Sequence, residues 1–305
     1  MADQNAPAAG RTYTCPYCGA ASDGTALSCP GCGSPIDVRS IVSPARWSEA
    51  PAQKDMAKLK FGDSVCQIEG AYVPVADLQL AAGDGVYFAH HVLLWMDGQV
   101  QVGAMPLKGA FKRMLAGMPI VMTEAKGPGR IAFSRDAPGE LLALPLQKGD
   151  AVDVREHLLV VATHSVAYDW FQTNVWYKIR IRKGNETETE TIYPVGMLMD
   201  RFTASAGPGF LLIHASGNVF VRNLQPGETI LIKPTSLLYK DPSVQMQLHF
   251  EHPSQTFSFF GGYSQRYTWL RLHGPGRVGV MSAFEPVEGE HAQLVGFSPA
   301  TERRW

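Results

Sequence analysis

The feature that most constrains the fold is a frame of glycine and apolar residues that occurs three times, here called the glycine frame. With Gly83, Gly149 and Gly227 as position zero, an acidic residue follows at offset one and apolar residues follow at offsets three, five, ten and seventeen. The aligned residues are Asp84, Asp150 and Glu228; Val86, Val152 and Ile230; Phe88, Val154 and Ile232; Leu93, Leu159 and Leu237; and Val100, Val166 and Val244. Matches at so many fixed offsets predict three internal repeats.

Within each copy of the glycine frame, the spacing predicts β-strands. Apolar residues two positions apart, at offsets three and five, lie on one face of a strand, and the apolar residues around offset ten predict a second strand. Turn-forming pairs then precede a third strand. The motif Gly-Pro-Gly, which begins at residues 127, 207 and 274, marks a further turn before each alternating apolar run. The chain is therefore predicted to be mainly β.

A charged β-ribbon is expected in the segment VWYKIRIRKGNETETETIY, residues 175–193. A three-residue loop at 183–185 would place Arg182 opposite Glu186, and two further basic residues opposite glutamates. These charge pairs would fix the register of the two strands.

One short helix is expected between residues 107 and 118. Its apolar residues would share one helical face, and Pro119 would end it. They are Leu107, Phe111, Met114, Leu115 and Met118.

The segment CPYCGAASDGTALSCPGCG, residues 15–33, contains two C-P-x-C-G turns separated by ten residues. Cys15, Cys18, Cys29 and Cys32 would present four thiolates at the tetrahedral Zn–S distance of about 2.3 Å. A segment this short forms no core, so metal binding would supply its folding free energy. We predict a zinc ribbon with structural Zn²⁺; an iron site, a redox pair and two disulfides are the alternatives. A closed site of this kind is not expected to be catalytic.

These features divide the chain into four regions. We expect a disordered leader at 1–12, the zinc ribbon at 13–36, a linker rich in proline and alanine at 37–57, and a repeat-built β domain at 58–300.

Composition excludes several classes of protein. The 305-residue chain has a net charge of −1, whereas nucleic-acid-binding proteins usually carry a basic excess; nucleic acid is not an expected partner. No apolar run approaches the ~20 residues that a transmembrane helix needs, which leaves peripheral association with a membrane open. Five cysteines, an odd number, without an apolar secretion signal suit a reducing compartment. We expect a cytoplasmic protein.

Three stretches resemble the altered inheritance of mitochondria protein 24 family: KGAFKRMLAG at 108–117, GPGRIAFSRDAPGELLALPLQKGDAVDV at 127–154 and GPGFLLIHASGNVFVRNLQPGETILI at 207–232. The resemblance spans roughly residues 58–297. It implies a β-sandwich similar to the tryptophan RNA-binding attenuator protein, or a distorted double-stranded β-helix, and it implies a homo-oligomer. Mitochondrial members are linked to inner-membrane organisation. The family implies no catalytic residues, and the four-cysteine segment is an addition to its pattern.

Histidines and one cysteine are the remaining candidates for chemistry. A cupin-like metal site would draw on His90, His91, His157, His249, Glu251 and His252. Alternation along a strand places neighbours on opposite faces, so His90 would point away from His91. We therefore expect these histidines to be surface or core residues, and Cys66 to be a small buried residue and not a nucleophile. The chain is predicted not to be an enzyme.

The favoured function is a non-enzymatic oligomeric scaffold or binding protein with a zinc-ribbon adaptor, through which a protein partner would bind. The alternatives are a metal-dependent cupin-like enzyme and a nucleic-acid-binding protein that uses the ribbon.

Overall fold

The computed structural model describes residues 12–14, 19–23, 29–31, 47–49, 57–105, 122–184, 186–251, 266–299 and 301–304. These residues form strands and their connections, so the chain is mainly β, as predicted. Two compact units are present. Unit 1 comprises Met1–Ala151, His157–Asp169 and Phe202–Phe220, and unit 2 comprises Val152–Glu156, Trp170–Arg201 and Val221–Trp305. The predicted β domain at 58–300 therefore contributes to both units.

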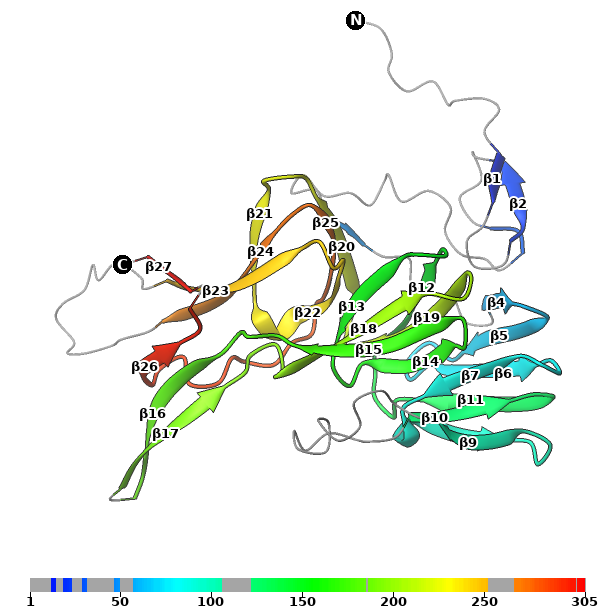
Figure 1. Cartoon of the computed structure of the whole chain (residues 1–305), viewed down its shortest axis with the longest axis horizontal. Helices are drawn as coiled ribbons and strands as arrows, with labels where there is room; N and C mark the ends of the chain where they lie inside the picture. Colours follow the sequence, from blue (N-terminus) through cyan, green and yellow to red (C-terminus); the bar gives the residue numbers. More distant parts are fainter. Residues whose placement is uncertain are drawn as a thin grey trace, which may run out of the picture. The chain divides into compact units, whose positions relative to one another are not determined.

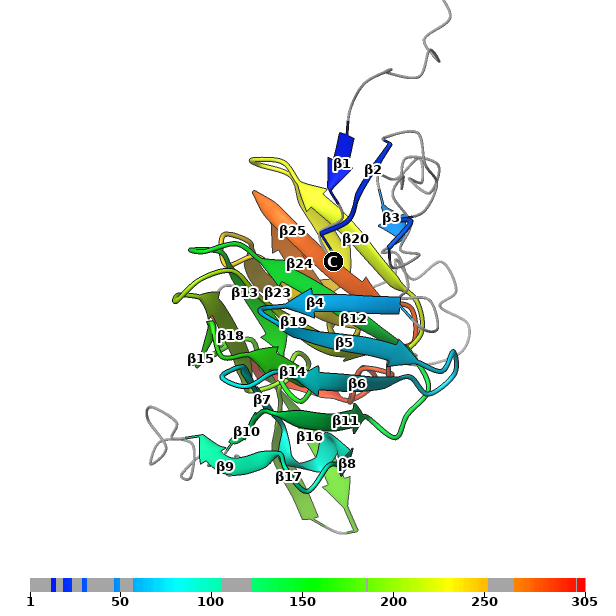
Figure 2. The same ribbon diagram turned by 90° about the vertical axis from the view of Figure 1, so that its right-hand side faces the viewer.

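Unit 1 contains two large antiparallel sheets (Figure 1), besides a short two-stranded one. The first has six strands, in the order β12 (Glu140–Leu146), β19 (Gly209–Ala215), β14 (Leu159–Thr163), β7 (Gly85–Phe88), β10 (Met122–Lys126) and β9 (Gln101–Met105). The second has five strands, which Figure 2 shows side by side, in the order β4 (Ala57–Phe61), β5 (Ser64–Glu69), β6 (Val75–Leu80), β11 (Gly129–Ser134) and β8 (Leu93–Met96).

The two sheets of unit 1 share one hydrophobic core, to which both contribute buried side chains. The ring of Phe88 on β7 lies 4.7 Å from the ring of Phe133 on β11, measured between centroids. A second ring contact joins Phe61 on β4 to Phe210 on β19, at 5.1 Å. The sheets therefore pack face to face, as the two layers of a sandwich do.

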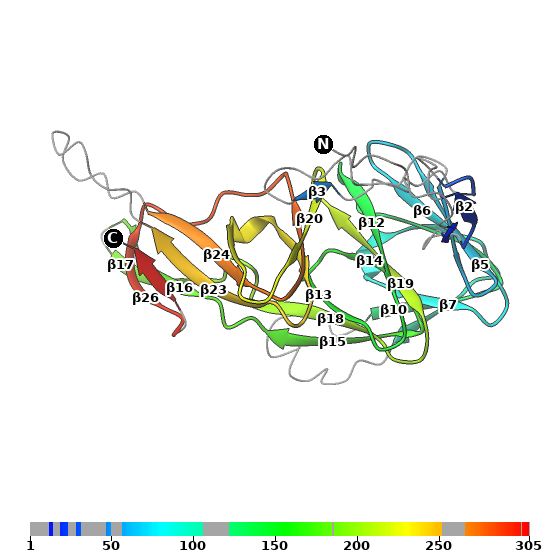
Figure 3. The ribbon, with the colours of Figure 1, turned by 90° about the horizontal axis from the view of Figure 1, so that it is seen from above.

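Unit 2 contains three sheets, two of which are complete within it (Figure 3). One has the order β17 (Glu186–Ile192), β16 (Tyr177–Lys183) and β26 (Gln293–Phe297). Another has the order β21 (Thr229–Ile232), β24 (Tyr267–His273), β23 (Gln245–Glu251) and β27 (Glu302–Arg304). The third is formed by those parts of β15 (Val166–Gln172), β18 (Leu198–Ala204), β13 (Ala151–Arg155), β22 (Leu237–Lys240), β25 (Gly276–Met281) and β20 (Val219–Leu224) that belong to this unit.

The remaining elements are short. They are the paired strands β1 (Thr12–Thr14) and β2 (Ala21–Asp23), strand β3 (Ser48–Glu49), and the 3-10 helices η2 (His90–Val92) and η3 (Pro234–Ser236). The helix expected at 107–118 lies outside the described residues. In the part of the chain that the structure describes, no helix is long and apolar enough to span a bilayer.

The three glycines of the glycine frame share one backbone conformation. Gly83, Gly149 and Gly227 have φ values of +92°, +96° and +80°, a region that glycine enters without steric cost. The amide of the next residue donates in each case to the carbonyl three residues earlier, at 3.2, 2.9 and 2.9 Å. A strand follows each of these tight turns: β7, β13 and β21.

A second hydrogen bond also recurs three times. The amide that follows each Gly-Pro-Gly motif donates to the side chain at offset fourteen of the frame: Arg130 to Asp97 Oδ2 at 3.0 Å, Phe210 to Thr163 Oγ1 at 3.2 Å, and Arg277 to Asp241 Oδ2 at 2.8 Å. In all three copies of the frame, the strand that begins near offset ten pairs with the strand that begins at the Gly-Pro-Gly motif. These pairs are β8–β11, β14–β19 and β22–β25, and each of them contains a register shift.

The register expected for the charged ribbon is wrong. Lys183 pairs with Glu186, so Arg182 lies opposite Thr187 and the loop contains two residues. Gly184 has a φ of +64°, which suits the two-residue hairpin turns whose twist matches that of the strands. The geometry of the turn, and not the charge pairs, sets the register.

Candidate functional site

The described part of unit 1 contains a cleft of about 460 Å³, a size typical of small-molecule sites. It lies where β4, β12 and β14 end and where β7 and β19 begin. The residues that line it are Leu59, Lys60, Phe61, Gly62, Gly83, Asp84, Gly85, Ala143, Pro145, Leu146, Gln147, Thr163, His164, Ser165, Pro208, Gly209 and Phe210. Two copies of the glycine frame supply part of this lining, so the turns of the frame position the cleft.

The lining of the cleft combines polar groups with apolar side chains of the core. Leu59, Ala143, Leu146 and Phe210 are buried core residues, and Phe61 packs its ring edge-on against Phe210. These side chains come from both sheets of the sandwich. The cleft therefore opens directly onto the hydrophobic core of unit 1.

The polar side chains of the cleft hold its walls together. Asp84 accepts hydrogen bonds from the amide of Asp63 at 3.0 Å and from the hydroxyl of Ser64 at 2.6 Å. The Ser165 hydroxyl donates to the carbonyl of Pro208 at 2.9 Å, and Thr163 Oγ1 accepts from the Phe210 amide. Each of these groups therefore helps to hold the wall of the cleft in place.

A glycine permits the close approach of two walls. A Cβ atom at Gly209 would lie 2.2 Å from Ser165 Oγ and 2.5 Å from Thr163 Oγ1, well inside the contact distance of such atoms. Glycine is therefore required where β19 begins beside the end of β14.

His164 is the one histidine of the cleft lining. Its Nε2 lies 3.6 Å from Glu124 Oε2 on β10. Burial lowers the pKa of His164 from its usual value near 6.5, and Glu124 opposes this effect only in part. Near pH 7 the imidazole is therefore neutral, and it contributes a polar but uncharged surface to the cleft.

Comparison with known proteins gives the family. A model of the family described as Mitochondrial biogenesis AIM24 matches residues 66–283, which is more than two thirds of the chain. The chain belongs to this family. The resemblance found in the sequence is thereby confirmed.

The fold of this AIM24 family member is similar to that of a solved structure. The crystal structure of a Streptococcus pyogenes protein superposes with a TM-score of 0.50 at 17% identity, over 72% of this chain and 94% of that chain. At this identity the likeness shows the fold alone. No protein with a curated description matches the chain.

The structure of the AIM24 family member brings three of the candidate histidines together in unit 1. His90 and His157 are close enough for their charges to act on His91. The expectation that His90 and His91 lie on opposite faces of a strand is wrong, because they occupy the 3-10 helix η2. Among the described residues, no group of three or more histidines, cysteines or carboxylates is arranged to hold a metal ion.

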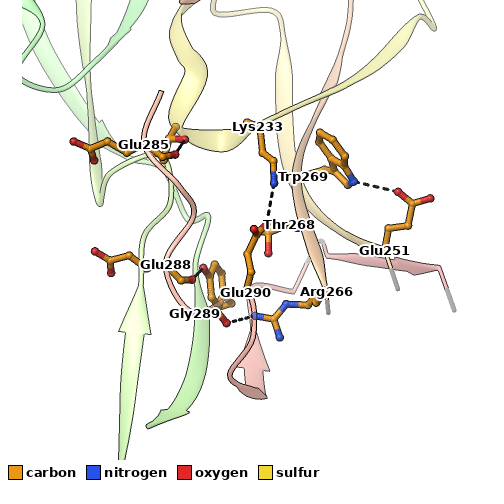
Figure 4. A network of polar contacts seen from close by, with 11 residues as sticks. Lys233, Glu251, Arg266, Thr268, Trp269, Glu285, Glu288, Gly289 and Glu290 are labelled. Atoms are coloured by element: carbon orange, nitrogen blue, oxygen red, sulfur yellow. Dashed lines mark hydrogen bonds and ion pairs between the residues drawn. The ribbon is translucent and has the colours of Figure 1, made fainter. Parts of the chain in front are cut away.

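The other candidates lie in unit 2. His249 and Glu251 are two residues apart on β23, and His252 lies outside the described residues. Trp269 Nε1 donates to Glu251 Oε2 at 3.1 Å (Figure 4). His249 is buried opposite Trp269 in the strand ladder. Sequence alternation correctly places His249 and Glu251 on one face of a strand.

A polar network that the sequence did not indicate joins η3, β24 and the segment before β26 (Figure 4). Glu290 Oε1 accepts from Lys233 Nζ at 3.0 Å and from the Thr268 amide at 2.9 Å. Lys233 Nζ also lies 5.1 Å from the centre of the Trp269 ring, a cation–π distance. Arg266 donates to the carbonyl of Gly289 at 2.9 Å. These contacts connect segments distant in sequence, which is a structural role.

The four predicted zinc ligands fall mainly outside the described residues. Cys15, Cys18 and Cys32 are not among them. Cys29 is buried, and its Sγ accepts a hydrogen bond from the Gly31 amide at 3.4 Å. The zinc site itself stays a prediction.

Cys66 has the surroundings expected from the sequence. It is fully buried on β5 within the core of unit 1, and burial raises the pKa of its thiol well above the usual value. The thiolate is therefore not formed near neutral pH, and Cys66 packs as a small apolar side chain.

Proposed function

We propose that this AIM24 family member is a non-enzymatic binding protein that holds an apolar or amphipathic small molecule in the cleft of unit 1. One observation carries the proposal: apolar core side chains from both sheets reach the lining of the cleft, whereas Asp84, Thr163 and Ser165 make hydrogen bonds that join its walls. Such a lining, to which His164 adds a neutral polar contact, favours retention of a ligand over its conversion.

We also propose that the β structure that carries this site is built from three repeats of the glycine frame. The equal φ values at Gly83, Gly149 and Gly227, the recurring side-chain hydrogen bond at offset fourteen and the three equivalent strand pairs support it. The first copy lies in unit 1, the second is divided between the two units, and the third lies in unit 2. The first two copies supply residues to the lining of the cleft.

A homologous series of n-alkanols, from hexanol to dodecanol, tests the proposed cleft by calorimetric titration. Each added methylene that enters an apolar site should contribute about 0.8 kcal/mol, which is roughly a fourfold gain in affinity. The gain should stop when the cleft is full. Affinity that does not change with chain length would contradict an apolar site.

Three substitutions locate the binding. Ala143→Leu places extra side-chain volume in the cleft and should weaken alkanol binding about tenfold or more, whereas Ala104→Leu makes the same change on the exposed strand β9 and should have no effect. Phe61→Ala enlarges the cleft and should move the chain-length optimum to a longer alkanol. Unchanged binding by Ala143→Leu, in a protein that keeps its melting temperature, would place the ligand elsewhere.

We also propose that the chain assembles with further copies of itself through the edge strand β8. Leu94, Trp95 and Met96 are exposed large apolar residues on this strand, which lies at one end of the five-stranded sheet. An edge strand with exposed apolar side chains is prone to pair with another chain. The four-cysteine segment would serve as a zinc-ribbon adaptor that binds a protein partner.

Light scattering tests the proposed assembly. The wild-type mass should be a multiple of 33.3 kDa, and Trp95→Lys should shift it toward a single chain, because a lysine on an edge strand opposes pairing. A wild-type protein that stays at the mass of one chain at micromolar concentration would refute the assembly.

A further inference from the structure

Arg135 has surroundings that are unusual for a guanidinium group. It follows β11 in unit 1 and is half-buried, and its Nε atom is buried without a hydrogen-bond partner in the described chain. Its Nη1 lies 2.6 Å from Nε2 of His91, and no ion pair with a carboxylate is formed by Arg135 among the described residues. A buried N–H group without a partner is unfavourable.

The groups around Arg135 are basic. His90 and His91 belong to η2, His157 precedes β14, and the His214 ring on β19 contacts the carbonyl of Ala137 at 3.2 Å. The charges that act on His91 are those of Arg135, His157 and His90, and that of Arg135 also acts on His214. The cluster therefore combines one permanent positive charge with four imidazoles.

The acidic residues nearest in sequence do not compensate this charge. Asp136 is exposed and its amide bonds to the Ser134 hydroxyl. Glu140 Oε1 accepts from Asn218 Nδ2 at 3.2 Å. Neither carboxylate is among the groups that shift the pKa of Arg135, which burial lowers.

A tetrahedral dianion would complete this cluster. The guanidinium presents N–H donors in a planar fork that matches an oxyanion, and imidazoles placed on three other segments can donate from further directions. We propose that Arg135, His91 and the neighbouring His90, His157 and His214 form a binding site for a phosphate- or sulfate-type oxyanion. The site lies at the ends of β7 and β19 opposite to the cleft, so it is separate from the proposed ligand site.

Binding of the anion should be linked to proton uptake. In the free protein, burial and the Arg135 charge lower the pKa of His91 from its usual value near 6.5. Because arginine only donates, Nε2 of His91 accepts from the guanidinium in the free protein. A bound dianion favours the imidazolium form and raises that pKa, and both groups then donate to the anion in place of their mutual contact. Affinity should therefore increase as the pH falls from about 7.5 to about 6, the range in which His91 is protonated to a greater extent in the complex than in the free protein.

Calorimetric titration of the full chain at low ionic strength tests the site. Sodium sulfate is the main probe because it keeps two charges over this pH range, and inorganic phosphate and glycerol phosphate form two further arms. We expect saturable binding of sulfate that strengthens about tenfold between pH 7.5 and pH 6. Tighter binding of glycerol phosphate would identify a phosphate monoester as the preferred ligand, and equal binding would identify the free anion.

Variants separate the site from general electrostatic attraction. Arg135→Gln should weaken sulfate binding about tenfold or more, and His91→Gln should reduce the pH dependence. Arg182→Gln removes one positive charge from the exposed ribbon of unit 2. It should change neither the affinity for sulfate nor the pH dependence of that affinity. Non-saturable binding, or equal binding by Arg135→Gln in a folded protein, would overturn the proposal. So would a His91 ring whose NMR titration does not shift to higher pH in sulfate.

Discussion

Replacing Asp153 with asparagine is expected to lower the free energy of unfolding by about 3–5 kcal/mol. The Asp153 carboxylate on β13 is fully buried in unit 2. It accepts from Arg201 Nε at 2.6 Å, from Arg201 Nη2 at 2.9 Å and from Lys240 Nζ at 2.8 Å. Lys240 is itself buried, so loss of the carboxylate leaves an ammonium group without its counter-charge. Denaturant unfolding followed by fluorescence measures the effect.

Two further variants test the reason for this loss. The double variant Asp153→Asn, Lys240→Met removes both buried charges and should recover a large part of the lost stability. Lys126→Met breaks an ion pair with Glu124 that is half exposed, and it should cost less than about 1 kcal/mol. A loss below about 1 kcal/mol for Asp153→Asn, or no recovery in the double variant, would be inconsistent with a buried charge cluster that stabilises unit 2.

Substituting cysteines of the four-cysteine segment should abolish zinc binding. A structural zinc ion supplies an apparent ~10–16 kcal/mol to the folding of such a segment, and a closed four-thiolate site does not keep its metal after losing ligands. We expect one zinc per chain in the wild-type protein and none after Cys15→Ser with Cys29→Ser. Elemental analysis by mass spectrometry of protein purified without added metal provides the count.

Cys66→Ala is the matched control for this experiment. Cys66 lies in the core of unit 1, so its removal should leave the zinc content unchanged. Zinc that persists after the double cysteine substitution would refute the predicted ligands, and iron in its place would favour the alternative metal. A wild-type protein with neither metal would refute the ribbon as a metal site.

Much of the fold could be predicted from short-range patterns. The glycine frame locates tight turns because only glycine takes positive φ at no steric cost, and Gly83, Gly149 and Gly227 all do so. Apolar residues at alternate positions predict strands, and Val152 and Val154 do lie on β13. Asp153 between them is buried as well, so both faces of this strand are covered, which the alternation does not predict. Such features depend on residues close in sequence.

Features that depend on turn geometry could not be predicted as well. The ribbon pairs with Lys183 opposite Glu186 because a two-residue turn fits the strand twist, although another register would pair more opposite charges. η2 places His90 and His91 in a 3-10 turn, which the strand periodicity around them does not suggest. Exposed charge pairs are too weak to decide a register against a turn.

The candidate sites arise from contacts between distant segments. The cleft of unit 1 joins residues near 60, 84, 145, 164 and 209, and Arg135 meets His91 across 44 positions of sequence. No single sequence motif contains the residues that make these contacts. They follow from the strand order of the two sheets, which brings the ends of β7, β14 and β19 together.

The central claim, that the cleft of unit 1 holds apolar molecules, is tested most directly by the heat-capacity change of decanol binding. Calorimetric titration at several temperatures should give a clearly negative value for the wild-type protein, because apolar surface is removed from water. Ala104→Leu should give the same value, and Ala143→Leu should show little or no binding. A heat-capacity change near zero, or full binding by Ala143→Leu, would contradict the account.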